Sequence, residues 1–207
     1  MKVKLLIILI FLIVVKTNAF GGDDKVVAPL LGITYGGFTP LHPGFDDIYT
    51  STSSPMEYYF GVGYNKIYLI GKFKKFRGSG KSVTTDVNYI GNADYNQEFF
   101  MFGLRFYNNT PAKMKYFLEF GAVSSLVEES ISTLNRQPEL FSKTESQEWG
   151  FSIAAGGQFM FSDFVGLSGS AEYTRIIYNI EEGIERGDVN LGGFYFSVGI
   201  VFMPFSD

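Results

Sequence analysis

The chain alternates large apolar residues with small or polar ones in eight separate stretches. In the last stretch every second residue is large and apolar: Phe194, Phe196, Val198, Ile200 and Phe202. The positions between them include Ser197 and Gly199. Successive side chains of a β-strand point to opposite faces of the sheet, so each stretch predicts a strand with two chemically different faces.

The linkers between these stretches alternate between short and long. The predicted strands are 31–38, 56–64, 67–76, 97–107, 114–127, 148–161, 164–178 and 190–203. Three linkers are tight, and one of them carries the turn-forming run Asn108-Asn109-Thr110-Pro111. The pattern predicts an all-β fold, an eight-stranded antiparallel up-and-down transmembrane β-barrel over residues 31–207.

The first 19 residues have the pattern of a secretory signal peptide. Two lysines precede the apolar run 5–15, and the small residue Ala19 marks a cleavage site. The alternative is an uncleaved membrane anchor, but the run is about half of the ~20 residues that a spanning helix needs, and Lys16 interrupts it. We therefore expect export, cleavage after Ala19 and a short periplasmic segment at 20–30.

Composition narrows the possible partners. Cleavage removes three of the 17 basic residues and leaves 14 against 21 acidic ones, a net charge of −7, which argues against nucleic acid. The chain has no cysteine, so an exported protein must be held together without disulfides. Beyond the leader no run approaches the ~18 apolar residues of a membrane helix, so any membrane embedding must be by strands. No cofactor and no metal ion is predicted.

Two arguments place the large apolar face outside the barrel, whereas a soluble barrel of the lipocalin kind would turn it inward. An eight-stranded barrel encloses only enough space for side chains or one small ligand, so rows of Phe, Tyr, Leu and Ile would overfill it. The opposite rows hold Gly, Ser, Ala, Thr and a few ions, which suit a narrow lumen but make a poor aqueous surface. About five apolar residues per strand are close to what crosses a hydrocarbon core at a ~45° tilt.

Aromatic residues near the ends of the apolar rows fit the two membrane–water interfaces. These interfacial aromatics are Tyr35, Tyr58, Tyr64, Trp149 and Tyr173. Membrane lipid is therefore the expected surrounding of the barrel.

With its signal peptide, eight strands and alternating loop lengths, the chain resembles the small outer-membrane β-barrel proteins of the OmpX and OmpA transmembrane-domain type. The resemblance covers nearly all of the mature chain. It implies an outer-membrane location, with outer-membrane lipid around the barrel, and recognition by the barrel-assembly machinery. The terminal strand of such proteins carries alternating hydrophobic residues that end in an aromatic one. The row Phe194, Phe196, Val198, Ile200 and Phe202 matches this assembly signal, although the tail 203–207 follows it. We expect a monomer.

Eight charged residues fall on the rows predicted to face the lumen: Glu57, Lys72, Lys74, Arg105, Lys115, Glu119, Glu148 and Glu172. Unpaired ions in a narrow lumen are costly, so we expect hydrogen-bonded pairs, with Arg105 binding a carboxylate such as Glu119 on the adjacent strand. In one interpretation this network only fills and rigidifies the lumen. In the other it forms a gated, narrow ion path.

Two local motifs suggest other chemistry. The segment 77–82, Arg-Gly-Ser-Gly-Lys-Ser, resembles a phosphate-binding loop but has Lys75 where that motif needs a glycine, so we interpret it as a flexible surface loop. His42 is the only histidine and precedes Asp46 and Asp47, an arrangement compatible with a metal site or an acid–base pair. Without a second histidine we interpret it as a solvated loop residue, and no catalytic residue is predicted.

The predicted long loops are acidic. Their acidic residues include Glu128, Glu129, Glu139, Glu145, Glu181, Glu182, Glu185 and Asp188. These residues either keep the protein soluble and apart from its neighbours or bind cations or a basic extracellular partner. We predict a non-enzymatic outer-membrane protein whose loops serve surface interaction or envelope integrity. The alternatives are a narrow pore or export accessory and a lipid-modifying enzyme.

Overall fold

The structure, a computed structural model, describes residues 27–42, 45–49, 51–64, 66–84, 89–108, 113–133, 142–180 and 187–203. Its elements are β1 (Val27–Pro40), α2 (Phe45–Ile48), β2 (Ser51–Thr52), β3 (Met56–Tyr64), β4 (Ile67–Thr84), β5 (Tyr89–Tyr107), β6 (Met114–Thr133), β7 (Ser142–Met160), β8 (Val165–Ile180), β9 (Gly187–Asn190) and β10 (Gly193–Phe202). The predicted signal peptide, 1–19, lies outside the described residues. Among the described residues, no helix has the length and apolar character needed to cross a membrane.

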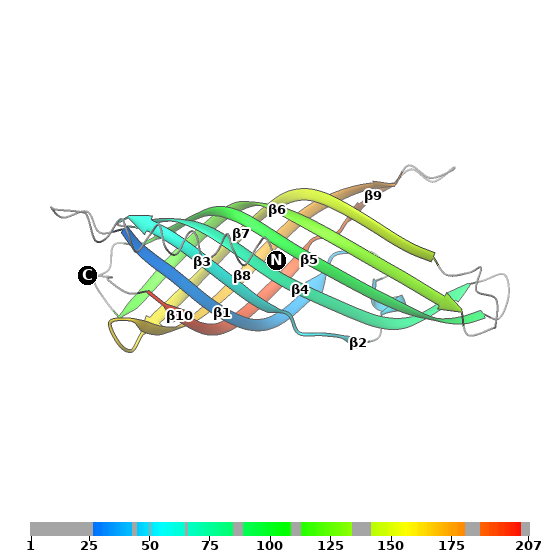
Figure 1. Cartoon of the computed structure of the whole chain (residues 1–207), viewed down its shortest axis with the longest axis horizontal. Helices are drawn as coiled ribbons and strands as arrows, with labels where there is room; N and C mark the ends of the chain where they lie inside the picture. The colour runs from blue at the N-terminus through cyan, green and yellow to red at the C-terminus, as the bar shows by residue number, and fades with distance from the viewer. Residues whose placement is uncertain are drawn as a thin grey trace, which may run out of the picture.

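The strands form a closed eight-stranded barrel in which neighbours run antiparallel (Figure 1). β1 closes it by pairing with β10 and with β3, so that Leu31 lies opposite both Phe202 and Phe60. Two short strands are additions: β2 pairs with β4, and β9 pairs with β8. The predicted all-β, antiparallel, up-and-down barrel is confirmed.

The two ends of the barrel differ. The tight connections β3–β4, β5–β6 and β7–β8 lie at one end, together with the start of β1 and the end of β10 (Figure 1). At the other end β4, β6 and β8 end and β5, β7 and β9 begin. We call these ends the turn side and the loop side.

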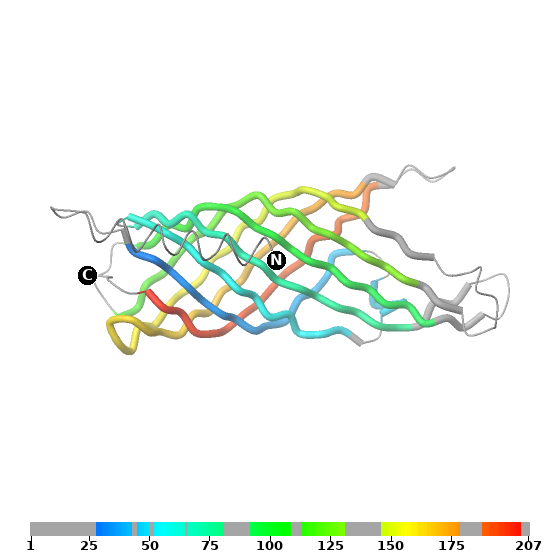
Figure 2. The backbone as a smooth tube through the Cα atoms, in the orientation of Figure 1, coloured from blue at the N-terminus to red at the C-terminus, as the bar shows by residue number. Residues whose placement is uncertain are grey.

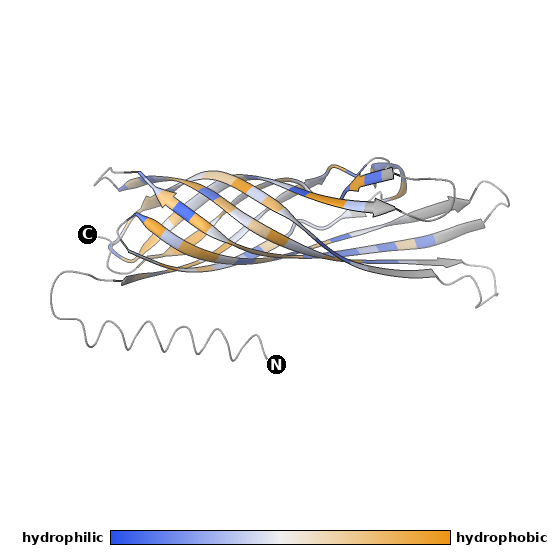
Figure 3. Cartoon of the chain, turned by 90° about the horizontal axis from the view of Figure 1, so that it is seen from above, coloured by the Kyte–Doolittle hydropathy of each residue, from blue (hydrophilic) through white to orange (hydrophobic). Residues whose placement is uncertain are grey.

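The large apolar rows point outward, as predicted. Phe102, Phe196 and Val198 are 60%, 59% and 70% exposed, although each lies within a strand. Met101, the residue before Phe102 on β5, points inward and is only 6% exposed. Apolar residues gather over the part of the barrel that contains all eight strands (Figure 3). A contiguous outward surface this apolar suits hydrocarbon better than water.

Four strands continue beyond this band on the loop side. β4, β5, β6 and β7 contain 18, 19, 20 and 19 residues, whereas a tilted spanning strand needs about 9–11. They run past the ends of β1 and β10 (Figure 2). The predicted loops 77–96 and 128–147 are therefore mostly strand. Sequence alternation missed these extensions because small and polar residues interrupt the apolar row on their inward face, while their outward face is polar.

β1 begins at Val27 rather than at Leu31, so residues 27–30 belong to the barrel and not to the predicted periplasmic segment. These residues pair with β3, Val27 lying opposite Tyr64, while the pairing of β1 with β10 starts at Leu31. Among the described strands, residues 27–30 therefore have a neighbour only on the β3 side. Proline lacks a backbone N–H donor, and Pro29 is tolerated here because the open side of the strand needs no donor. The proline is what hid this part of the strand in the sequence.

Candidate functional site

The inward-facing side chains are stacked in three layers along the barrel axis, as β4 illustrates. Tyr68 and Ile70 lie nearest the turn side, Lys72 and Lys74 follow, and Phe76 lies nearest the loop side; all are buried. We call the middle layer the ionic layer. It consists of Glu57, Lys72, Lys74, Arg105, Glu119 and Glu172, each at most 6% exposed.

Lys72 is the centre of the ionic layer. Its Nζ lies 2.5 Å from Glu119 Oε1, 2.9 Å from Glu172 Oε2 and 3.8 Å from Glu57 Oε1. These carboxylates come from β6, β8 and β3, so one ammonium group links three other strands of the barrel wall. Buried carboxylates need such partners, because removing an ion from water without compensation costs several kcal/mol.

The other two cations complete a neutral layer. Arg105 donates from Nη2 and Nε to Glu119 Oε2, at 2.7 and 2.8 Å. Lys74 donates to Glu172 Oε1. Three cations therefore face three carboxylates, and the layer carries no net charge.

Aromatic rings contact the cations at both margins of the layer. On the loop side, Lys74 Nζ lies 4.7 Å from the ring centre of Tyr195 and 5.0 Å from that of Phe99. On the turn side, Arg105 Cζ lies 4.1 Å from the ring centre of Phe117. Cation–π attraction is strongest for desolvated cations, so these rings stabilise charges that water does not reach.

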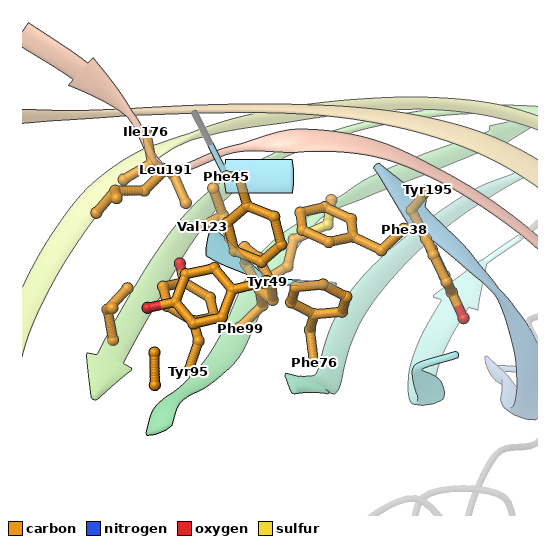
Figure 4. Packing of buried hydrophobic residues seen from close by; sticks show 13 residues of the cluster. Phe38, Phe45, Tyr49, Phe76, Tyr95, Phe99, Val123, Ile176, Leu191 and Tyr195 are labelled. Atoms are coloured by element: carbon orange, nitrogen blue, oxygen red, sulfur yellow. The ribbon is translucent and has the colours of Figure 1, made fainter. Parts of the chain in front are cut away.

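An apolar cluster lies on each side of the ionic layer. The turn-side cluster consists of Ala28, Leu30, Tyr59, Tyr68, Ile70, Tyr107, Phe117, Met160, Val201 and Met203. The loop-side cluster, shown in Figure 4, consists of Phe38, Phe45, Tyr49, Phe76, Ala93, Tyr95, Phe99, Met101, Val123, Val127, Ile176, Leu191 and Tyr195. Sequence reasoning expected small residues and ions here. The lumen also accommodates many rings, because inward glycines leave room for them: Gly32 lies against Tyr59, Gly63 against Tyr68 and Gly156 against Phe117.

The short helix α2 forms part of the loop-side cluster. The Phe45 ring lies 5.2 Å from that of Tyr95 and 5.8 Å from that of Phe76, and the Tyr49 hydroxyl donates to the Glu129 carboxylate. Burial and this hydrogen bond raise the pKa of Tyr49 well above its ordinary value. Contact between α2 and β4 depends on Gly80, where an added Cβ would lie 1.8 Å from the carbonyl oxygen of Ile48.

The segment 77–82 is thus part of β4 and not the flexible loop that the sequence suggested. Gly80 in this segment allows α2 to pack closely against the strand. The contact with α2 therefore explains why residue 80 is a glycine, without a phosphate-binding role.

Replacing Tyr49 with phenylalanine tests whether the hydrogen bond to Glu129 holds α2 in the barrel mouth. A hydrogen bond to a charged group is worth about 1.5–3 kcal/mol, so amide exchange at Tyr49, whose N–H donates to Phe45 O at 2.8 Å, should become at least tenfold faster. Tyr58→Phe is the matched control, because that hydroxyl is exposed on the outer wall. Equal exchange rates in the two variants would contradict the assignment.

Several uncharged residues of this lumen escaped the sequence analysis. Thr174 donates to Glu172 Oε1 at 3.0 Å, and Tyr107 donates to Gln158 Oε1 at 3.1 Å. Thr34 Oγ1 lies 3.5 Å from Glu57 Oε1. Their positions on the inward rows were the available signal, but polar side chains without charge did not stand out there.

Two of the eight predicted lumen charges lie outside the ionic layer. Lys115 is half-buried near the turn side, with Nζ 3.7 Å from Met203 Sδ. Glu148 is half-buried toward the loop side, opposite Ser125 in the register of β6 and β7. Charge and face alone do not specify height along the axis, and height decides which ions meet.

The predicted outer-surface residues lie on the outward rows. Of the interfacial aromatics, Tyr35, Tyr58, Tyr64 and Trp149 are exposed, while Tyr173 is half-buried with its ring 5.2 Å from that of Phe194. The row Phe194, Phe196, Val198, Ile200 and Phe202 is exposed on β10, the strand that closes the barrel against β1.

The remaining candidates are dispersed. His42 follows β1, half-buried, and its carbonyl accepts from Phe45 N at 3.2 Å. No group of three metal-binding side chains occurs within the described ranges. Glu128, Glu129, Glu145 and Asp188 lie in strands rather than loops, whereas Glu139, Glu181, Glu182 and Glu185 fall outside the described residues.

Comparison with known proteins supports the architecture. No protein-family model and no curated protein sequence matches the chain. Among solved structures, the outer membrane protein OprG from Pseudomonas aeruginosa is similar, with a TM-score of 0.62 and 14% identity over 87% of this chain and 97% of that one. A major outer membrane protein from Thermus thermophilus gives a TM-score of 0.52 and 5% identity over 86% and 99%. The chain has the fold of the small outer-membrane β-barrels.

Proposed function

We propose that the protein is a non-enzymatic outer-membrane barrel with a sealed lumen that presents an extracellular β-sheet for surface interaction. The outward apolar band supports the membrane location, since hydrocarbon is the solvent that such a surface prefers. Short turns at one end and longer connections at the other are typical of outer-membrane barrels, which keep the short turns in the periplasm.

The buried ionic layer is the observation that carries this proposal. Its three cations and three carboxylates pair with one another and lie between two apolar clusters. An ion that crossed this lumen would have to break these pairs and pass both clusters. This arrangement favours the interpretation that the network rigidifies the lumen over that of an ion path.

The surface role is supported by the extensions of β4, β5, β6 and β7. Their outer face changes from apolar to polar directly above the band, where Lys75 pairs with Glu98 at 2.6 Å and Asn96 donates to Glu128 at 3.3 Å. At ~3.3 Å per residue, the residues beyond those needed to span a membrane extend by about 26 Å along each tilted strand. A barrel that served only as a membrane plug would not need this projection.

Planar-bilayer recording tests the sealed lumen. We expect the purified protein to give no single-channel events in molar KCl, because the ionic layer and the apolar clusters leave ions no hydrated route. Protease added to intact cells should cut the loop-side connections and spare the turns. Steady conductance would reject the sealed lumen, and protection of the loop side would reject the orientation.

A further inference from the structure

We infer that the outer edge of β7 over residues 142–149 recognises an extended segment of another polypeptide by adding it as a strand. This inference deepens the proposed function, on which its extracellular location rests. It starts from the register of β7 with its two neighbours, β6 and β8.

On the loop side of Gly150, β7 is paired with only one of its two neighbouring strands. Its pairing with β6 continues to Ser142, opposite Ile131, but its pairing with β8 ends at Gly150, opposite Ile176. Beyond that point β8 pairs with β9, starting with Ile177 opposite Asn190. Within the described part of the chain, no segment pairs with the outer edge of residues 142–149.

The hydrogen-bond pattern shows which groups this edge offers. Met160 N donates to Lys113 O at 2.7 Å, so even-numbered residues of β7 direct their backbone groups to β6. The β6–β7 register is unbroken, so the N–H and C=O groups of 143, 145, 147 and 149 point the other way. Eight residues at ~3.3 Å each give an open edge of about 26 Å.

On the opposite edge of the projecting sheet, β4 is covered as far as Gly80, whereas β7 has eight consecutive residues for which the described part of the chain gives no partner on that side. On β4, Ser79 pairs with Ser51 of β2, and Gly80 lies against α2. The open stretch of β7 reads Ser-Lys-Thr-Glu-Ser-Gln-Glu-Trp, with no proline and a single lysine. Proteins usually protect edges with proline, lysines, bulges or a covering segment, because an uncovered edge is a template for strand addition.

Trp149 marks the turn-side end of this edge and offers an apolar contact. Its ring is 67% exposed on the outer face. It is also the only tryptophan in the chain, so its fluorescence reports on this position alone. A strand added to residues 143–149 would place one of its side chains beside this ring.

The test uses a random dodecapeptide library displayed on phage, selected against the full-length protein in lipid nanodiscs. A selected peptide without tryptophan is then titrated while Trp149 fluorescence is recorded. Gln147→Pro removes one N–H from the open edge and leaves the β6 ladder intact, and Gln147→Ala is the matched control. Heat-modifiable gel migration verifies that both variants fold.

We expect the peptide to bind Gln147→Pro at least tenfold more weakly than the wild type, and Gln147→Ala within threefold of it. Amide exchange at 145, 147 and 149 should slow when the peptide binds. Equal affinity for the two variants, protection confined to other strands, or the enrichment of no peptide would overturn the inference. If one of these contradicting outcomes is found while protease shaving still places the loop side outside the cell, the proposed surface role stands and only the edge recognition is wrong.

Discussion

Replacing Lys72 with methionine is expected to destabilise the barrel by about 3–5 kcal/mol, the cost of leaving a buried carboxylate without its partner. Arg105 still pairs with Glu119 and Lys74 still pairs with Glu172 in this variant. Glu57 loses the cation that lies 3.8 Å away and is left buried without an ion-pair partner. Urea unfolding in lipid vesicles, followed by Trp149 fluorescence, measures the change in the free energy of unfolding.

The double variant Lys72→Met with Glu57→Gln separates charge from packing. It leaves two neutral ion pairs and no unpaired carboxylate, so we expect it to regain more than half of the lost stability. If the single and double variants unfold at the same urea concentration, the loss comes from packing around the lysine stem, and the account of the ionic layer as a balanced network is wrong.

Replacing Gly36 with alanine is expected to weaken barrel closure, whereas the same change at Gly37 is not. An added Cβ at Gly36 would lie 1.8 Å from the carbonyl oxygen of Phe196, so β1 and β10 would have to separate where they close the barrel. Overpacking of this kind costs roughly 1–3 kcal/mol, and more where the backbone must move. The folded fraction, read from heat-modifiable gel migration, should fall for Gly36→Ala.

Gly37 is the matched control, because it is the next residue of the same strand and an added Cβ there meets no atom within 4 Å. Alanine at an unstrained glycine position usually stabilises a protein slightly, by reducing the freedom of the unfolded chain. We therefore expect Gly37→Ala to fold at least as well as the wild type. Equal losses in both variants would mean that the seam between β1 and β10 does not depend on close backbone approach.

The fold could be predicted because period-two alternation is a local property. Each row, such as Phe194 to Phe202, specifies its own two faces whatever the rest of the chain does. The prediction failed where that signal ends: in the extensions of β4, β5, β6 and β7 small and polar residues interrupt the inward apolar row, and Pro29 masks the start of β1. The pair Arg105 and Glu119 could be predicted because the two residues lie opposite each other on adjacent strands.

The central role of Lys72 could not be predicted in the same way. Lys72 and Glu172 lie on strands that are not neighbours in the sheet and are separated by 100 residues, yet their charged atoms are 2.9 Å apart. The sequence by itself determined which side chains face inward and which face outward, because strand geometry assigns faces residue by residue. Only the closed barrel decided which inward residues meet and which strand edge stays open, because both depend on the register and stagger with which all eight strands close.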